Sequence, residues 1–241
     1  EISACLVGSE MCIRDRKKLA PGQPIIEAVS GPFATALTLA GLTAGHPVVL
    51  VMPEDAPALR QENLLRLGTQ IQHSPARSGL AGARAMAAQT AAANGWYYTD
   101  WLANDNNPEY HRRVTGPAIL QNIAREGASL VDAITVGVGS AGTVTGVGET
   151  IKAWTNDVRI VAVEPYENQV LGGGLTGPHG IPDIGYGIVP ENYNGYVVDN
   201  VSAVASRDAQ RAAQQVLRTD AIPASISAGA ALHLSLIHIS E

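Results

Sequence analysis

Short runs of apolar, β-branched residues alternate along the chain with longer segments of helical pattern, and this alternation limits the fold more than any other feature. In the first part of the chain the runs occupy residues 24–30, 47–53, 69–74 and 96–99, and the helical segments after them occupy 33–44, 57–67, 79–93 and 108–126. Such alternation predicts right-handed βαβ units and a parallel sheet. We therefore expect an α/β fold with ligands at the carboxyl ends of the strands.

A second series of the same kind follows a polar, turn-rich segment at residues 101–111. Its predicted elements are a strand at 133–139, a helix from 143 to about 154, a strand at 159–165, a loop-rich stretch at 166–196, a strand within 196–205, and a helix to about 219 with Ser206 as N-cap. The polar segment predicts a boundary between two lobes, residues 17–107 and residues 108–233.

The two ends of the chain differ in composition from the part between them. Residues 1–16 and 234–241 lack its richness in Ala, Gly and β-branched residues, and both resemble translated sequencing-adapter sequence. We expect them to be non-native tails on a truncated parent chain, with a genuine pair of unusual tails as the alternative. Both cysteines, Cys5 and Cys12, lie in the first tail and support no disulfide or metal argument.

Composition excludes several classes of protein. The 241 residues are 46% hydrophobic and 16% charged, which is typical of a folded globular chain and not of a disordered one. The formal net charge is −6 and no stripe of Lys and Arg is present to neutralise phosphates, so nucleic acid is not an expected partner. No run approaches the roughly 18 apolar residues of a spanning helix, so no membrane partner is expected either. The histidines show no metal-ligand spacing, and no metal is predicted.

A glycine-rich segment, VGVGSAGTVTG at residues 136–146, joins a predicted strand to a predicted helix. Glycines let a backbone approach a ligand closely, and a helix N-terminus offers unpaired N–H groups and a positive dipole end. Ser140 and Thr143 add hydroxyl donors. The segment therefore predicts a phosphate site, with a tight turn whose glycines are merely steric as the alternative.

The same glycines also fit a dinucleotide fingerprint. Gly137, Gly139 and Gly142 satisfy GxGxxG, and Glu164 ends the next predicted strand, where an acidic residue would bind a ribose. A nicotinamide-dependent oxidoreductase is thus a competing prediction. Over a hundred residues of βα pattern precede this fingerprint, whereas it normally opens the cofactor domain.

Six segments decide between these predictions because they occur together in one order: APGQPIIEAVSG, VVLVMPEDAPALRQENLLRLGTQI, NPEYHRRVTGPAIL, GVGSAGTVTGVGETIKA, VEPYENQVLGGGLTGPHGIPDIGYGIVP and ASISAGAAL. Over residues 20–233 the chain resembles the cysteine synthase and cystathionine β-synthase family of pyridoxal-phosphate enzymes, with the two-lobed, tryptophan-synthase-β-like fold (fold type II). Six ordered matches are more specific than one GxGxxG, so the oxidoreductase becomes the weaker prediction.

The resemblance implies a set of cofactor-binding residues in the second lobe. Ser227 stands where the family places a hydroxyl on the pyridine nitrogen, which favours elimination and replacement at the β-carbon. Gly185 matches a glycine loop that lines the cofactor face. Taken alone, Ser227 also fits a helix N-cap and Gly185 a simple turn. The implied phosphate cup consists of Gly139, Ser140, Ala141, Gly142 and Thr143.

The resemblance places the substrate loop in the first lobe, where this chain departs from the family pattern. The implied substrate-binding residues are Ser30, Gly31, Pro32 and Phe33. The family loop reads approximately TSGNTG, so Pro32 replaces an Asn that contacts the cofactor ring oxygen and Phe33 replaces a Thr that helps bind the substrate carboxylate. Trp101 stands near the position of a Gln that reaches the substrate. These three changes predict a more apolar pocket or a weakened one. Ser30 and Gly31 alone would also fit a strand end.

The family's catalytic lysine has no counterpart in the matched segments, so we assign no catalytic residue. The chain contains Lys17, Lys18 and Lys152 as its lysines, and we expect Lys152 to be a solvated helix residue. His111 matches a family position that is expected to be structural rather than a base. Whether this chain is itself an enzyme is therefore left open, although the resemblance implies an enzymatic parent.

The resemblance implies pyridoxal 5′-phosphate as cofactor and a β-replacement reaction, in which an activated serine and sulfide give cysteine. It further implies a small amino-acid substrate, a homodimer and a cytoplasmic location. A related lyase or dehydratase, a cystathionine β-synthase-like enzyme and a non-catalytic binding module remain alternatives.

Overall fold

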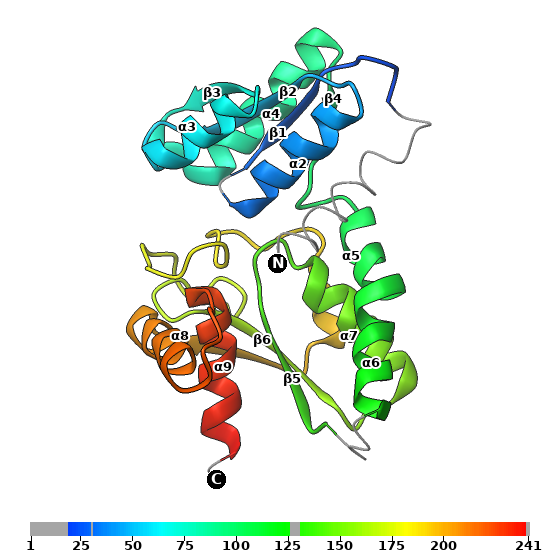
Figure 1. Ribbon diagram of the computed structural model, residues 1–241, viewed down its shortest axis with the longest axis vertical. Helices are drawn as coiled ribbons and strands as arrows, with labels where there is room; N and C mark the ends of the chain where they lie inside the picture. The colour runs from blue at the N-terminus through cyan, green and yellow to red at the C-terminus, as the bar shows by residue number, and fades with distance from the viewer. Residues whose placement is uncertain (1–18, 30, 126–130, 240–241) are drawn as a thin grey trace. The chain divides into compact units, whose positions relative to one another are not determined.

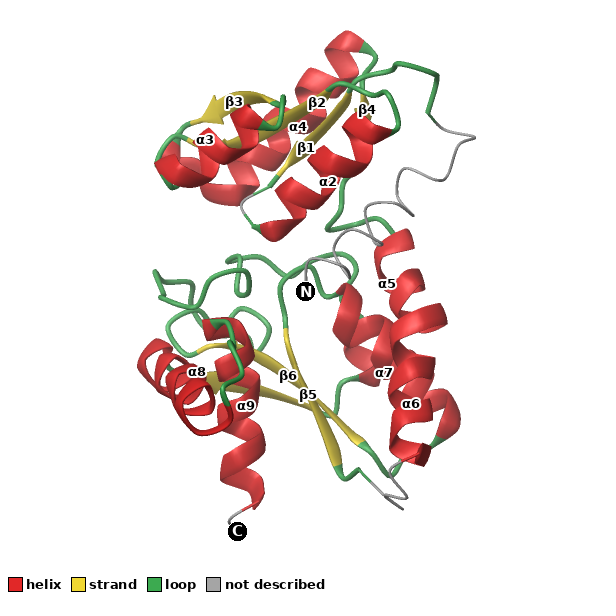
Figure 2. Ribbon diagram, viewed as in Figure 1, coloured by secondary structure: helices red, strands yellow, loops and turns green. Residues whose placement is uncertain are grey.

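The computed structural model describes residues 19–29, 31–125 and 131–239, and the chain divides into two compact units, residues 1–107 and residues 108–241. Each unit contains a parallel β-sheet with helices packed on both of its faces (Figures 1 and 2). The predicted parallel α/β architecture is therefore confirmed. The segment expected as the first tail lies outside the described residues.

Unit 1 is built on a four-stranded sheet with strand order β3-β2-β1-β4. Its strands are β1 (Ile25–Ala28), β2 (Val48–Pro53), β3 (Gln70–Ser74) and β4 (Tyr97–Tyr98). Its helices are α2 (Pro32–Thr43), α3 (Ala58–Arg66) and α4 (Gly79–Asn94), with a 3₁₀ turn at Ala76–Ser78. All strand pairs are parallel, so the carboxyl ends of β1 and β4 meet at one edge of the sheet.

The core of unit 1 follows from the two-residue period of its strands. Ile25 and Leu50 point toward α2 and α3, whereas Ile26 and Val51 point toward α4 on the opposite face. Each of these side chains is fully buried, which is worth about 1.5–3 kcal/mol per side chain relative to exposure. Burial on both faces explains why these strands read as continuous apolar runs.

Unit 2 contains a three-stranded parallel sheet with strand order β5-β6-β7. The strands are β5 (Ala133–Gly137), β6 (Arg159–Pro165) and β7 (Asn200–Val204). The helical elements are α5 (Asn106–Tyr110, which begins at the unit boundary), a π-helical turn (His111–Thr115), α6 (Gly116–Arg125), α7 (Gly142–Trp154), a 3₁₀ turn (Gly195–Val197), α8 (Ser206–Asp220) and α9 (Ile226–Ile239). Figure 2 shows α6 and α7 on one side of β5 and β6, and α8 and α9 on the other.

Two predictions about the helices of unit 2 are corrected. The helix expected over residues 108–126 contains the π-helical turn His111–Thr115, and α7 packs on this turn so closely that a Cβ on Gly146 would lie 2.6 Å from the Cβ of His111. Ser206 is the first helical residue of α8 and not its N-cap, which is Ala205. Its hydroxyl instead accepts the N–H of Gly180 at 2.8 Å.

Candidate functional site

The turn between β5 and α7 holds the residues expected to bind a phosphate. Val138, just after β5, donates its N–H to the Val163 carbonyl of β6 at 3.0 Å, and α7 begins at Gly142. Ala141 lies between them with φ +65°, in the left-handed region that costs a residue with a Cβ about 1–2 kcal/mol. Because the first N–H groups of α7 have no intrahelical partner, the turn presents donors and a positive dipole end to an anion.

A second loop of unit 2 packs against this turn. A Cβ on Gly139 would lie 2.5 Å from the Asp183 carbonyl oxygen and 3.5 Å from the Tyr186 hydroxyl, so only glycine fits there without displacing backbone. The N–H of Gly185 donates to the Val138 carbonyl at 3.1 Å. The structure therefore brings the predicted phosphate turn and the predicted glycine loop together.

Gly185 is held by two side chains that sequence reasoning missed. Its φ is +63°, and a Cβ would lie 2.5 Å from the Cδ of Pro165. Its carbonyl oxygen accepts the Asn168 side-chain N–H at 2.8 Å and lies 2.8 Å from His179 Nε2. His179 Nδ1 accepts the N–H of Ile181 at 3.3 Å, so Nε2 carries the ring proton and donates to Gly185. Both residues lie within the VEPYENQVL and GPHG portions of the fifth matched segment.

Ser227 lies at the start of α9, beside the end of β5. The hydroxyl of Ser225 accepts the N–H of Ala228 at 3.1 Å, so Ser225 rather than Ser227 caps this helix. The hydroxyl of Ser227 lies 3.0 Å from that of Ser225. The Ser227 carbonyl oxygen would lie 3.8 Å from a Cβ on Gly137, which places this serine next to the strand that leads into the phosphate turn.

The corresponding turn of unit 1, between β1 and α2, has a different chemical character. Ser30 falls outside the described residues. Gly31 is the N-cap of α2, and Pro32 follows at the first helical position, where proline offers no backbone N–H. The Phe33 ring stacks on Trp101, with ring centroids 4.9 Å apart and planes 14° apart. Two of the three residues that depart from the family pattern therefore contact each other.

Trp101 directs both of its N–H groups toward β1. The indole N–H donates to the Ala28 carbonyl and the main-chain N–H to the Glu27 carboxylate, each at 3.0 Å. The side chain is only 7% exposed. Trp101 therefore holds the loop after β4 against the carboxyl end of β1.

Glu27 is a fully buried acid at the centre of these contacts. The sequence did not single it out as a site residue because it lies within an apolar run that predicts only a strand. Burial raises its pKa to about 8, even though hydrogen bonds from the Thr99 hydroxyl and from the N–H groups of Trp101 and Ala28 act in the opposite direction. The carboxyl group joins β1 to the loop after β4.

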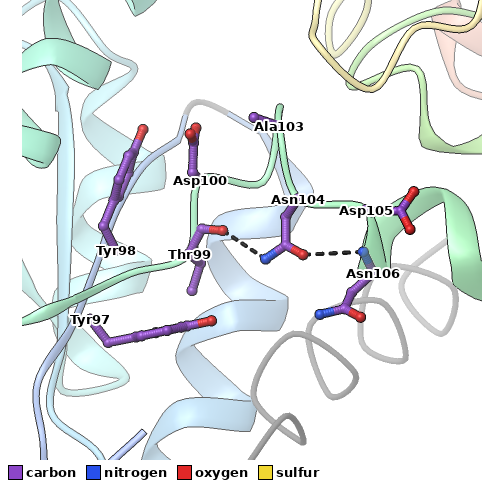
Figure 3. A pocket seen from close by; sticks show the side chains of 8 residues that line it. All are labelled: Tyr97, Tyr98, Thr99, Asp100, Ala103, Asn104, Asp105 and Asn106. Atoms are coloured by element: carbon purple, nitrogen blue, oxygen red, sulfur yellow. Dashed lines mark hydrogen bonds between the residues drawn. The ribbon is translucent and has the colours of Figure 1, made fainter. Parts of the chain in front are cut away.

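That loop also lines an open pocket of about 440 Å³ in unit 1 (Figure 3). Asn104 donates to the Thr99 carbonyl at 2.9 Å and accepts the N–H of Asn106 at 3.1 Å, which shapes the loop. Because β1 and β4 are parallel, the pocket lies at the sheet edge where β1 leads into Gly31. The lining residues are Tyr97, Tyr98, Thr99, Asp100, Ala103, Asn104, Asp105 and Asn106.

The expectation that Lys152 is solvated is wrong. Its side chain is 16% exposed, and its ammonium group pairs with Asp199 at 2.7 Å and donates to the Val158 carbonyl at 3.1 Å. It therefore fastens the end of α7 to β6 and the loop before β7. Lys17 and Lys18 lie outside the described residues.

A comparison with protein families matches the description "pyridoxal-phosphate dependent enzyme" over residues 6–239. The chain belongs to this family. The resemblance stated from the sequence is thereby confirmed, and the cofactor of the family is pyridoxal phosphate.

Individual relatives of this member of the pyridoxal-phosphate family agree with that assignment. Cysteine synthase of Staphylococcus aureus strain Mu50 is 32% identical over 224 residues, which cover 93% of this chain and 71% of the relative. The solved structure of cysteine synthase (OASS) from Entamoeba histolytica is 30% identical with a TM-score of 0.88, covering 99% of this chain and 70% of that one. The structure of O-ureido-L-serine synthase is 27% identical with a TM-score of 0.93, covering 100% and 75%. The predicted two-lobed fold is confirmed by these neighbours.

The dinucleotide hypothesis gains no support from the geometry. Glu164, the expected ribose ligand, is 2% exposed, and its carboxylate accepts the N–H groups of Leu171 at 2.8 Å and Gly172 at 3.0 Å. The acid thus shapes the loop after β6.

Within the described part of the chain, no helix combines the length and apolarity needed to cross a bilayer.

Proposed function

We propose that the β5–α7 turn binds the phosphate of pyridoxal 5′-phosphate, and that the chain is part of an enzyme for a β-replacement reaction on an activated L-serine with sulfide as nucleophile. One observation carries the proposal: Gly139, Gly185 and Ser227, which the resemblance implies as cofactor contacts from three different segments of the chain, lie close together around the carboxyl end of β5. Family membership and relatives named cysteine synthase support the same reaction.

The described residues fit the phosphate end of the cofactor. Gly139 has no side chain of its own to shield its backbone N–H, and the start of α7 supplies further N–H donors. The hydroxyl of Thr143 adds a donor. Among residues 19–29, 31–125 and 131–239, the lysine present is Lys152, whose amine is engaged with Asp199, so none of these residues is assigned to the cofactor aldehyde.

Each group has a distinct role in this proposal. The bound cofactor supplies an electron-accepting ring that stabilises negative charge at the α-carbon of the amino acid. Residues 139–143 hold the phosphate, Gly185 lines one face of the ring, and the neutral Ser227 hydroxyl faces the pyridine nitrogen and leaves it largely unprotonated. The substrate loop consists of Ser30, Gly31, Pro32 and Phe33, in which Ser30 and Gly31 would bind the amino-acid carboxylate, whereas Pro32 has no N–H and Phe33 no polar side chain to add.

The first test compares pyridoxal 5′-phosphate with pyridoxal, which lacks the phosphate, by calorimetric titration of the full chain. We expect pyridoxal to bind at least tenfold more weakly, because it forfeits charge-assisted hydrogen bonds worth about 1.5–3 kcal/mol each. Equal affinities would refute a phosphate site.

A glycine variant locates the site on the chain. Gly139→Ala would place a Cβ 2.5 Å from the Asp183 carbonyl oxygen, so we expect pyridoxal-phosphate affinity to fall by more than about tenfold. Gly195→Ala is the matched control, because its Cβ meets only ordinary contact, 3.6 Å from the Tyr193 ring. An unchanged affinity in Gly139→Ala would place the phosphate elsewhere.

Lysine chemistry is tested separately from binding. After mixing with pyridoxal 5′-phosphate and reduction by borohydride, we expect no stoichiometric adduct at Lys17, Lys18 or Lys152. An adduct at one of them would identify the amine that holds the cofactor and would overturn the absence of an assigned catalytic lysine.

The Phe33–Trp101 stack favours a second candidate, a non-catalytic binding module with this fold. Cysteine formation from O-acetyl-L-serine and sulfide would exclude that candidate.

Family resemblance also supports a homodimer and a cytoplasmic location as parts of the main proposal. A monomeric mass in light scattering at micromolar concentration would count against the homodimer.

A further inference from the structure

Three polar side chains next to the β5–α7 turn are joined in a row by hydrogen bonds. Thr115 Oγ1 lies 2.9 Å from His111 Nδ1, and His111 Nε2 lies 3.2 Å from Thr143 Oγ1. Thr143 is the second residue of α7, whereas His111 and Thr115 are the first and last residues of the π-helical turn. The row therefore connects the predicted phosphate turn to a separate helical element of unit 2.

Close packing of α7 on the π-helical turn places this row. A Cβ on Gly146 would lie 2.6 Å from His111 Cβ and 2.9 Å from the Arg112 nitrogen, so glycine permits the approach. The Thr150 hydroxyl of α7 lies 3.2 Å from the Arg112 carbonyl oxygen of the turn and 2.9 Å from the Gly146 carbonyl oxygen of its own helix. Single π-helical turns are frequently found at functional positions.

The imidazole of His111 is neutral at physiological pH. Burial lowers its pKa to about 4. Arg112 and Arg113 on the same turn are both paired with carboxylates: Arg112 with Glu109 at 2.7 Å and with Glu149, and Arg113 with Glu109 at 2.5 Å. A neutral ring has one N–H donor and one nitrogen acceptor, so the row has a direction: it runs either from Thr115 toward Thr143 or the reverse.

The direction of the row decides what Thr143 can offer to an anion. If Thr143 donates its single O–H to His111, it presents only lone pairs to the turn. If it accepts from His111 Nε2–H, its own O–H is available. A phosphate oxygen accepts hydrogen bonds from the groups around it, so the second arrangement is the one that binds.

We propose that His111 and Thr115 are positioning residues that aim the Thr143 hydroxyl at the phosphate. Thr115 donates to Nδ1, Nε2–H donates to Thr143 Oγ1, and Thr143 donates to a phosphate oxygen. This inference rests on the proposed function, because it requires that residues 139–143 hold a phosphate.

The direct test is nitrogen NMR of the full chain carrying ¹⁵N-labelled histidine, with the His111 signals assigned by their loss in His111→Gln. Spectra are recorded alone, with inorganic phosphate and with pyridoxal 5′-phosphate. We expect Nε2 to carry the proton and Nδ1 to act as acceptor when either ligand is bound. A bound state with the proton on Nδ1 would overturn the proposal.

A pair of variants tests the donor at the far end of the row. Thr115→Val keeps the side-chain shape and removes the hydroxyl, whereas Thr115→Ser keeps the hydroxyl. We expect Thr115→Val to weaken pyridoxal-phosphate binding about fivefold, the effect of one hydrogen bond of about 1 kcal/mol. Thr115→Ser should retain the wild-type affinity, and pyridoxal affinity should be the same in both variants, since only the phosphate contact is altered.

The outcomes separate this inference from the proposed function. If the wild type binds pyridoxal 5′-phosphate and Thr115→Val binds it equally well, the positioning role is refuted while the phosphate site stands. If the wild type binds neither ligand, the phosphate site and the positioning role both fail. Should Thr115→Val not fold, the proton position on His111 in the wild type still decides.

Discussion

Each of the two units leads from a parallel strand into a helix through a turn at the carboxyl edge of its sheet, yet the two turns differ in what they offer a ligand. The β5–α7 turn has glycine at 139 and 142 and presents the N–H groups of a 13-residue helix. The β1–α2 turn has Pro32 at the first helical position and a Phe33–Trp101 stack beside it. The shared topology therefore sets where a ligand can bind in each unit. The residues in the first turn of the helix decide which chemical groups that ligand contacts.

The units also differ in the titratable group buried near each turn. In unit 1 the fully buried acid Glu27 has its pKa raised to about 8, and in unit 2 the partly buried base His111 has its pKa lowered to about 4. Both groups are held in their neutral forms by burial. Their contributions to stability must therefore respond to pH in opposite directions.

The largest expected effect is that of pH on Glu27. Between its ordinary value of 4.5 and the folded value of about 8, the unfolded chain loses the Glu27 proton and the folded chain keeps it. The Glu27 contribution to stability is therefore full below pH 4.5 and is lost as the pH rises to 8. Urea unfolding of the full chain, followed by circular dichroism, should show Glu27→Gln gaining on the wild type across this range. A constant difference between the two would contradict a raised pKa.

His111 should show the opposite and smaller dependence, because its pKa is displaced less. Here the unfolded chain takes up a proton near the ordinary value of 6.5, whereas the folded chain does so near 4. The contribution is full above pH 6.5 and is lost as the pH falls to 4. In the same unfolding measurement, wild type should lose stability relative to His111→Gln as the pH decreases through this window. If the wild type gained instead, His111 would be charged in the folded chain.

The aromatic stack of unit 1 is expected to contribute less. Phe33→Leu keeps an apolar side chain and removes the stacking on Trp101, so we expect a loss of about 0.5–1.5 kcal/mol. In a background that carries both Trp96→Phe and Trp154→Phe, which leaves Trp101 as the single tryptophan, the fluorescence should also change. Leu39→Ala, on the same helix and 37% exposed, is the control that should leave this emission unaltered. Unchanged emission in Phe33→Leu would mean that the rings do not stack in solution.

The smallest effect is expected at Ala141 in the phosphate turn. Its φ of +65° strains an alanine and suits a glycine, so Ala141→Gly should raise the stability by about 0.5–1 kcal/mol. Thermal unfolding of the two proteins measures this difference. Destabilisation by glycine would show that the left-handed backbone at this position is not strained.

Local pattern was sufficient to predict the elements that both units share. The runs at 47–53 and 159–165 became β2 (Val48–Pro53) and β6 (Arg159–Pro165), because side chains buried on both faces of a parallel sheet leave an unbroken apolar signal. Choices between similar local signals were less successful. Ser206 has the residue type of an N-cap, but its hydroxyl is taken by Gly180, a partner distant in sequence.

The residues of the candidate site likewise fall into two groups: those that a local sequence motif predicts and those whose role depends on partners distant in the sequence. Glycines at 139 and 185 could be selected from motifs, and the structure shows the close contacts that demand them, although their roles toward the cofactor remain predictions. Glu27, Asn168 and His179 were missed because their importance depends on partners brought together by folding. No spacing rule within a single segment encodes those contacts.

A crystal structure of the full chain with pyridoxal 5′-phosphate addresses the contrast between the two turns most directly. We expect the phosphate oxygens within about 3 Å of the N–H groups of residues 139–143 and the pyridine nitrogen facing Ser227. A phosphate bound at the β1–α2 turn, or away from both turns, would contradict the assignment of the cofactor site to unit 2.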